Sequence, residues 1–118
     1  MRKSKINISG FKIGTAENRE GLTGVTVILA PDGGATAGVD VRGCAPGTRE
    51  TDLLDPRKTV QKIHAVVLSG GSAFGLEAAS GCVKYLAEQG VGFPIGNVCV
   101  PIVCSAVLFD LMIGDEKA

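Results

Sequence analysis

The chain is poor in aromatic residues and carries no net charge. It has no tryptophan, one tyrosine and four phenylalanines among 118 residues. Twelve Lys and Arg residues are balanced by twelve Asp and Glu residues. Proteins that bind nucleic acids use basic surfaces and exposed aromatic side chains on which bases stack. The composition therefore argues against nucleic acid and anionic lipid as partners.

Histidine is scarce, and the cysteines are widely spaced. The one histidine is His64, and Cys44, Cys82, Cys99 and Cys104 form no C-x-x-C pair. Common zinc sites need four Cys or His ligands at short spacings, so we expect no metal site. We expect the cysteines to be buried small hydrophobic residues, reduced in a cytoplasmic chain. We also expect His64 to be a core or interface residue.

No uninterrupted apolar run has the length of a membrane span. The apolar segment Val98–Gly114 is short for that purpose, and Pro101 and Asp110 interrupt it. The basic start, Met1 to Lys3, is not followed by the apolar core of a signal peptide. We expect no membrane insertion, and we expect the 98–113 region to form one or two buried strands.

What the sequence does have is small and apolar residues: 17 glycines and a hydrophobic share of 45%. This composition and length predict a single folded domain over residues 1–118. The β-branched run 24–30, the turn Pro31-Asp32-Gly33-Gly34 and the segment Thr36–Val41 together predict a β-hairpin. Small residues in the returning strand indicate that another layer or a ligand approaches it closely.

Weaker patterns flank this hairpin. Residues Lys5–Ile13 alternate in polarity and predict an edge strand, and Thr15–Gly21 reads as a loop. Asp55-Pro56 predicts a helix start, with Asp as N-cap and Pro at the first helical position.

Residues 63–90 predict the centre of the fold. Ile63–Ser69 is apolar on both faces, which is typical of a central strand covered on both sides. A helix is expected from Ser72 to about Gln89, with Gly90 in the left-handed conformation that ends helices. Apolar residues recur every fourth position along it, at Phe74, Ala78, Cys82 and Leu86. The succession of elements predicts an α/β (α+β) layer fold.

The turn Gly70-Gly71-Ser72 joins that strand to that helix. A helix start carries unpaired N–H groups and partial positive charge, so a small anion could bind there. Ser72 could instead cap its own helix. A Ser72–His64 catalytic pair is disfavoured, because an extended strand would separate the two by roughly 25 Å. The turn also lacks the G-x-S-x-G nucleophile pattern.

A second cluster, Arg49-Glu50-Thr51-Asp52, packs two acids and one base into four residues. It reads either as a solvated loop or as part of a site, in which Arg49 would orient a carboxylate.

Three blocks of the sequence resemble the L-aminopeptidase/D-amidase/D-esterase family of self-processing peptidases. They are GCAPGTRETDLL from Gly43, HAVVLSGGSAFGL from His64, and VPIV with FDL from Val100. The blocks occur in order over most of residues 20 to 115, and they are more similar to the branch that hydrolyses nylon oligomers than to the β-peptidyl aminopeptidases. Cys44 and Cys104 stand where the family pattern has Gly and Pro.

The resemblance implies an αββα sandwich like that of the N-terminal-nucleophile hydrolases. The precursor cuts its backbone before a Ser or Thr, whose freed α-amine then acts as the base. It further implies peptide or small linear amide substrates, no metal or organic cofactor, and oligomers of processed pairs. The family nucleophile lies beyond residue 118, so no catalytic residue is assigned to this chain.

Two hypotheses follow. In the first, the chain is the amino-terminal segment of a self-processing aminopeptidase or amidase, partnered by a carboxy-terminal segment and assembled as a homo-oligomer. Gly70, Gly71 and Ser72 would then line the substrate pocket, as would Arg49, Glu50 and Asp52. In the second, the chain is a non-catalytic binding or assembly module that holds a small anion at the 70–72 turn.

Overall fold

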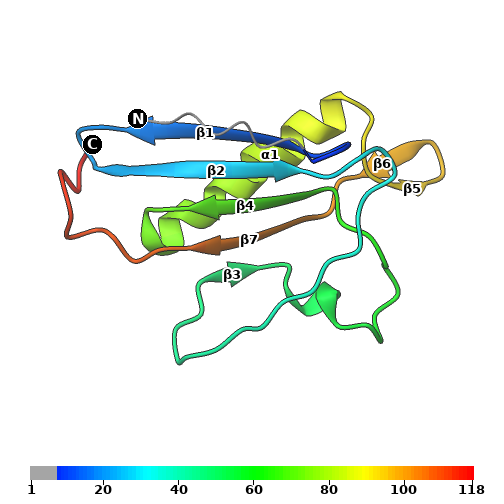
Figure 1. Cartoon of the computed structure of the whole chain (residues 1–118), viewed down its shortest axis with the longest axis horizontal. Helices are drawn as coiled ribbons and strands as arrows, with labels where there is room; N and C mark the ends of the chain where they lie inside the picture. The colour runs from blue at the N-terminus through cyan, green and yellow to red at the C-terminus, as the bar shows by residue number, and fades with distance from the viewer. Residues whose placement is uncertain (1–7) are drawn as a thin grey trace.

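One five-stranded sheet with an α-helix packed on one face makes up most of the fold (Figure 1). The structure is a computed structural model and describes residues 8–118. The strands are β1 (Lys12–Asn18), β2 (Thr23–Leu29), β3 (Thr48–Arg49), β4 (Ala65–Ser69), β5 (Phe93–Ile95), β6 (Val98–Val100) and β7 (Val103–Val107). The helix α1 spans Glu77–Glu88, and 3₁₀ helices span Asp52–Leu54 and Ser72–Leu76. This content confirms the α/β (α+β) class.

The strand order in the sheet is β1-β2-β4-β7-β3. Strands β4 and β7 are parallel, and the other neighbouring pairs are antiparallel. The chain passes from β4 to β7 through α1 and the separate β5–β6 hairpin, as a parallel pair requires a long crossover. The carboxyl ends of β4 and β7 therefore lie side by side at one edge of the sheet.

The core lies between α1 and strands β4 and β7. Val67 is fully buried, and Ala65 and Ala79 have 1% and 0% of their surface exposed. Because these side chains are small, α1 packs close to the sheet. Cys82, Leu86 and Val103 complete the buried cluster.

The other face of the sheet has no covering layer within residues 8–118. Alternation along the strands places Ile13, Ile28 and Leu68 on this open face, and Leu68 is 47% exposed. The expectation that residues 63–69 form the central strand is confirmed, but the expectation that both faces are covered is wrong for this chain.

The predicted hairpin between residues 24–30 and 36–41 is also wrong. Both edges of β2 are already paired, with β1 and with β4, so a returning strand has no free edge. The turn itself exists, since Gly34 N–H donates to Pro31 C=O. After it, Ala35 forms an isolated bridge with Ile63, and Thr36–Val41 forms no strand.

The flanking predictions are wrong in the bounds of the edge strand and in the kind of structure at Asp55. The edge strand expected over Lys5–Ile13 begins at Lys12 and runs on through the expected loop to Asn18; residues 1–7 lie outside the described part. Its side chains are all exposed, so it has little apolar periodicity to detect. The helix expected at Asp55 is a turn, in which the Asp55 carboxylate accepts a hydrogen bond from Arg57 N–H.

The long helix is confirmed from Glu77, and Gly90 has the expected left-handed φ of 69°. Its first turn is 3₁₀ rather than α-helical, which moves Phe74 out of the apolar stripe and leaves it 82% exposed. The 98–113 region contains two strands, of which β7 is buried and β6 is exposed. No helix among residues 8–118 combines the length and the apolar content required to cross a membrane.

Candidate functional site at the carboxyl ends of β4 and β7

The turn after β4 has an unusual backbone. Gly71 has φ 88° and Ser72 has φ 53°, so two consecutive residues are left-handed. That conformation is uncommon for residues other than glycine. Gly71 holds the N-cap position and no side chain caps the 3₁₀ helix, so the expectation that Ser72 caps its own helix is wrong.

Gly70 has room for no side chain. A Cβ placed there would collide with the Thr23 hydroxyl and with the Asp110 carboxylate. Thr23 begins β2, and Asp110 lies in the loop after β7; these two strands flank β4 in the sheet. The turn is therefore held by residues far apart in the sequence.

Asp110 is the centre of this arrangement. Its Oδ1 accepts a hydrogen bond of 2.7 Å from Gly71 N–H, and its Oδ2 accepts one of 2.7 Å from the Thr23 hydroxyl. The hydrogen bond from Thr23, followed by that from Gly71, lowers the pKa of Asp110 below its usual value. Neither Thr23 nor Asp110 is predicted from the sequence as a site residue. The sequence carries one signal for Asp110, because this acid closely follows the apolar run that forms β7.

The backbone donors of the turn all have partners within the chain. Gly70 N–H donates to Gly24 C=O and Ser72 N–H donates to Leu108 C=O, while Gly71 N–H donates to Asp110. An external anion would have to displace the Asp110 carboxylate to reach Gly71. The geometry therefore weighs against the anion-binding module.

A hollow of about 320 Å³ lies beside this turn on the open face. Ligands of open α/β sheets commonly bind at the carboxyl ends of parallel strands. This hollow lies at the carboxyl ends of the parallel strands β4 and β7. Its wall is largely apolar. It is lined by Gly24, Val25, Thr26, Leu68, Ser69, Gly70, Ala106, Val107 and Leu108.

Arg49 lies on the helix-covered side of the sheet, away from this hollow. Its Nη1 donates to Ser80 Oγ at 2.6 Å and to Leu76 C=O at 3.3 Å. These bonds tie the edge strand β3 to the start of α1. In this chain the guanidinium therefore acts as a structural link, and no bound carboxylate is needed to explain its position.

The two acids of the same cluster point elsewhere. Both side chains are exposed, and the Glu50 carbonyl accepts a hydrogen bond from the Cys104 thiol. Asp52 lines a separate hollow of about 420 Å³ with Val39, Thr51 and Lys58. The structure does not bring Glu50 or Asp52 to the 70–72 turn.

His64 is buried at the opposite end of β4 from Ser72. Only 5% of its surface is exposed, and its Nδ1 accepts a hydrogen bond from Ile102 N–H. Burial lowers the pKa of His64. The prediction of a core histidine is confirmed, and the arrangement leaves Ser72 without an imidazole base.

The cysteines divide into two groups. Cys82 and Cys104 are buried, as expected, but Cys44 and Cys99 are exposed, so the prediction is wrong for that pair. All four are free, and burial raises the pKa of Cys82 and of Cys104. Over residues 8–118, no three His, Cys, Asp or Glu side chains gather as metal ligands.

Comparison with known proteins finds similarity over most of the chain. The model of peptidase family S58 matches residues 5–118. An uncharacterized aminopeptidase of Mycobacterium leprae is 54% identical over 92 residues, which are 78% of this chain and 25% of that protein. An uncharacterized aminopeptidase of Mycobacterium tuberculosis is 54% identical over 91 residues, 77% of this chain and 26% of that protein.

A 6-aminohexanoate-oligomer endohydrolase of Agromyces is 37% identical over 106 residues, which are 90% of this chain and 27% of that enzyme. This chain thus spans about a quarter of the length of these relatives.

Proposed function

This chain belongs to peptidase family S58, and we propose that it is the amino-terminal segment of a self-processing aminopeptidase or amidase. The assembled enzyme hydrolyses amide bonds of small peptides or short linear amides. The names of two kinds of relative, aminopeptidase and 6-aminohexanoate-oligomer endohydrolase, both describe cleavage of an amide bond.

The nucleophile belongs to polypeptide outside this chain. Ser72 is the serine best placed at the sheet edge, yet the one histidine lies at the other end of β4. A serine or threonine hydroxyl needs a base to become a nucleophile. In a self-processed enzyme that base is the α-amine of the nucleophile residue itself, so a second segment would bring both groups together.

The role proposed for this chain is to line the substrate pocket. The attacking hydroxyl adds to the amide carbonyl carbon while the amine base takes its proton, and that proton goes to the departing amine as the C–N bond breaks. Water, deprotonated by the same amine, then hydrolyses the acyl-enzyme ester and frees the hydroxyl. The hollow beside Gly70 offers an apolar wall for the substrate. The carboxylate of Asp110 holds the turn that shapes this wall.

One observation supports the need for a partner most directly: the open face of the sheet. Ile13 and Leu68 are 45% and 47% exposed on that face, whereas the opposite face carries a packed helix. A carboxy-terminal segment laid across the open face would bury these side chains and complete a second layer. Assembly of such pairs into a homo-oligomer remains part of the proposal.

Complementation tests the function. The part of the Mycobacterium tuberculosis relative that follows its matched region serves as the complementing segment. The chain alone and the complementing segment alone should each leave amino-acid p-nitroanilides and 6-aminohexanoate dimers intact, and the mixture should cleave at least one of them. Full activity of the 118-residue chain by itself would contradict the proposal.

A further inference from the structure

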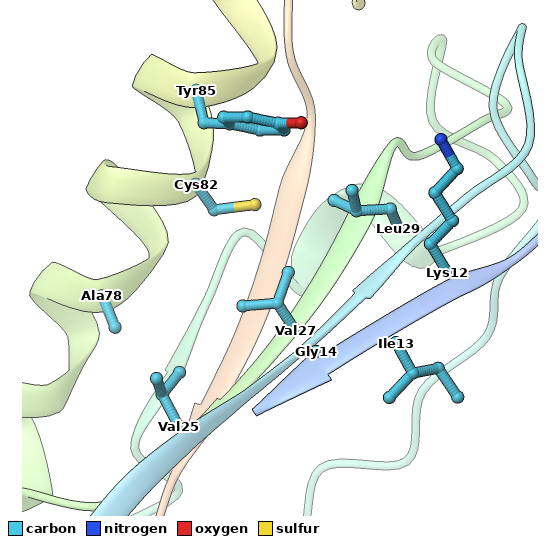
Figure 2. Close-up of a pocket in the computed structure, with 9 residues that line it drawn as sticks. All are labelled: Lys12, Ile13, Gly14, Val25, Val27, Leu29, Ala78, Cys82 and Tyr85. Carbon is cyan, nitrogen blue, oxygen red and sulfur yellow. The ribbon is translucent and has the colours of Figure 1, made fainter. Parts of the chain in front are cut away.

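A groove of about 510 Å³ runs between α1 and the β1–β2 hairpin, on the face opposite the open one (Figure 2). Its walls are almost entirely apolar. Val25, Val27 and Leu29 of β2 face Ala78, Cys82 and Tyr85 of α1, and Lys12 and Gly14 of β1 form the outer margin. The side chain of Ile13 leaves β1 on the other side.

The groove exists because α1 covers only part of the sheet. A helix is about 10 Å wide and strands lie about 4.8 Å apart, so one helix covers about two strands. The buried cluster joins α1 to β4 and β7, while Val25, Val27 and Leu29 are only partly buried. Strands β1 and β2 therefore have room beside α1 for a second helix.

Small residues shape the margin of the groove. The residues of β1 that face it are Lys12, Gly14 and Ala16, from the alternation and register of the strand. A Cβ on Gly14 would meet no atom within 4 Å. This margin lets the backbone of another element approach closely, which suits a helix better than an isolated side chain.

Charge marks one end of the groove. Lys12 pairs in register with Leu29 and carries the ammonium group seen at that end in Figure 2. The ion pairs of residues 8–118 join Arg19 to Glu17, Arg42 to Asp40 and Arg57 to Asp55, and none involves Lys12. An occupant with a carboxylate at this end would complement it.

We propose that the groove seats one amphipathic helix of the complementing segment, lying along α1 with a carboxylate against Lys12. Helices commonly bind by laying an apolar face into such a groove. The inference rests on the proposed function, and the length of the relatives supports this occupant. About three quarters of each lies outside the region that this chain matches.

Two substitutions test the groove. Gly14→Phe fills it, and Lys12→Glu reverses its charge; each should weaken binding of the complementing segment by roughly tenfold or more. The matched controls are Gly38→Phe, at an exposed loop glycine with open space around its Cβ, and Lys84→Glu, on the exposed side of α1. Both controls should bind like the unaltered chain.

Tyr85→Trp gives a direct fluorescent reporter of groove occupancy, because the unaltered chain has no tryptophan. Its emission should shift to shorter wavelength when the segment binds. Binding and activity without this shift, with Gly14→Phe and Lys12→Glu unimpaired, would overturn the groove proposal and leave the proposed function intact. Absence of binding by the unaltered chain would overturn both. Self-association of the chain alone that Gly14→Phe abolishes would identify a second copy as the occupant and overturn the proposal.

Discussion

The Asp110 carboxylate accepts a 2.7 Å hydrogen bond from the Gly71 N–H, although the two residues are 39 positions apart in the sequence. This bond joins the loop after β7 to the turn after β4. The same carboxylate reaches Thr23 at the start of β2. Three strand ends at one edge of the sheet are therefore fixed by one acidic side chain, and the proposed pocket wall depends on it.

The first prediction concerns pH and this carboxylate. Because the folded-state pKa of Asp110 is lowered, its stabilising contribution is present above the unfolded value of about 3.9 and is lost as the pH falls through the folded value. Asp110→Ala should lower the thermal midpoint at pH 7, and the difference from the unaltered chain should shrink in acid. Circular dichroism melts over a pH series measure this; Asp40→Ala is the exposed control. An equal difference at every pH would contradict the assignment.

The second prediction uses two glycines of the same helical region. A Cβ on Gly75 would collide with the Gly70 carbonyl oxygen, so Gly75→Ala should destabilise the chain by about 1–3 kcal/mol. Gly81 has open space around it, so Gly81→Ala should stabilise α1 by about 0.5–1 kcal/mol. Urea unfolding gives both values. Similar effects at the two positions would show that the turn is looser than described.

The third prediction concerns His64. Its pKa is lowered by burial, so the neutral form is favoured in the folded state. Stability should be fully present above the unfolded value of about 6.5 and should fall at lower pH, by at most about 1.4 kcal/mol per pH unit for one proton. His64→Gln retains an acceptor for Ile102 N–H and should flatten this dependence between pH 7 and 5. Urea unfolding at each pH gives the free energy of unfolding. If it falls with pH at the same slope in His64→Gln and in the unaltered chain, the prediction is wrong.

The fourth prediction addresses the open face. Leu68→Asp places a charge where the complementing segment is proposed to pack, so binding should weaken by roughly tenfold or more while the isolated chain keeps its fold. Leu22→Asp, at an exposed loop residue, is the control and should bind normally. Isothermal titration calorimetry compares the two; unchanged affinity for Leu68→Asp would exclude this face as the docking surface.

Local sequence signals predicted the elements that local chemistry determines. The strand at β2, the central strand β4, the Pro31–Gly34 turn and the end of α1 at Gly90 all follow from short patterns. The pairing of the strands could not be predicted from such patterns, because the pairing of β2 with β1 and β4 depends on competition among distant strands. Phe74 was misplaced because its turn is 3₁₀ rather than α-helical.

The candidate site shows the same division. The Gly70-Gly71 turn was predicted from two glycines between an apolar run and a helix. Asp110 and Thr23 were missed as site residues because the hydrogen bond between them joins positions 87 apart. Arg49, Glu50 and Asp52 are close in sequence, yet Arg49 bonds to the start of α1 while Glu50 is exposed and Asp52 lines a separate hollow.

Covalent labelling shows on which polypeptide the nucleophile lies. The complemented enzyme should be treated with a reagent that acylates activated serine or threonine hydroxyls, then digested and mapped by mass spectrometry. A label is expected on the amino-terminal Ser or Thr of a processed complementing segment, and none is expected on this chain. A label on Ser72 of this chain, with matching loss of activity, would contradict this expectation.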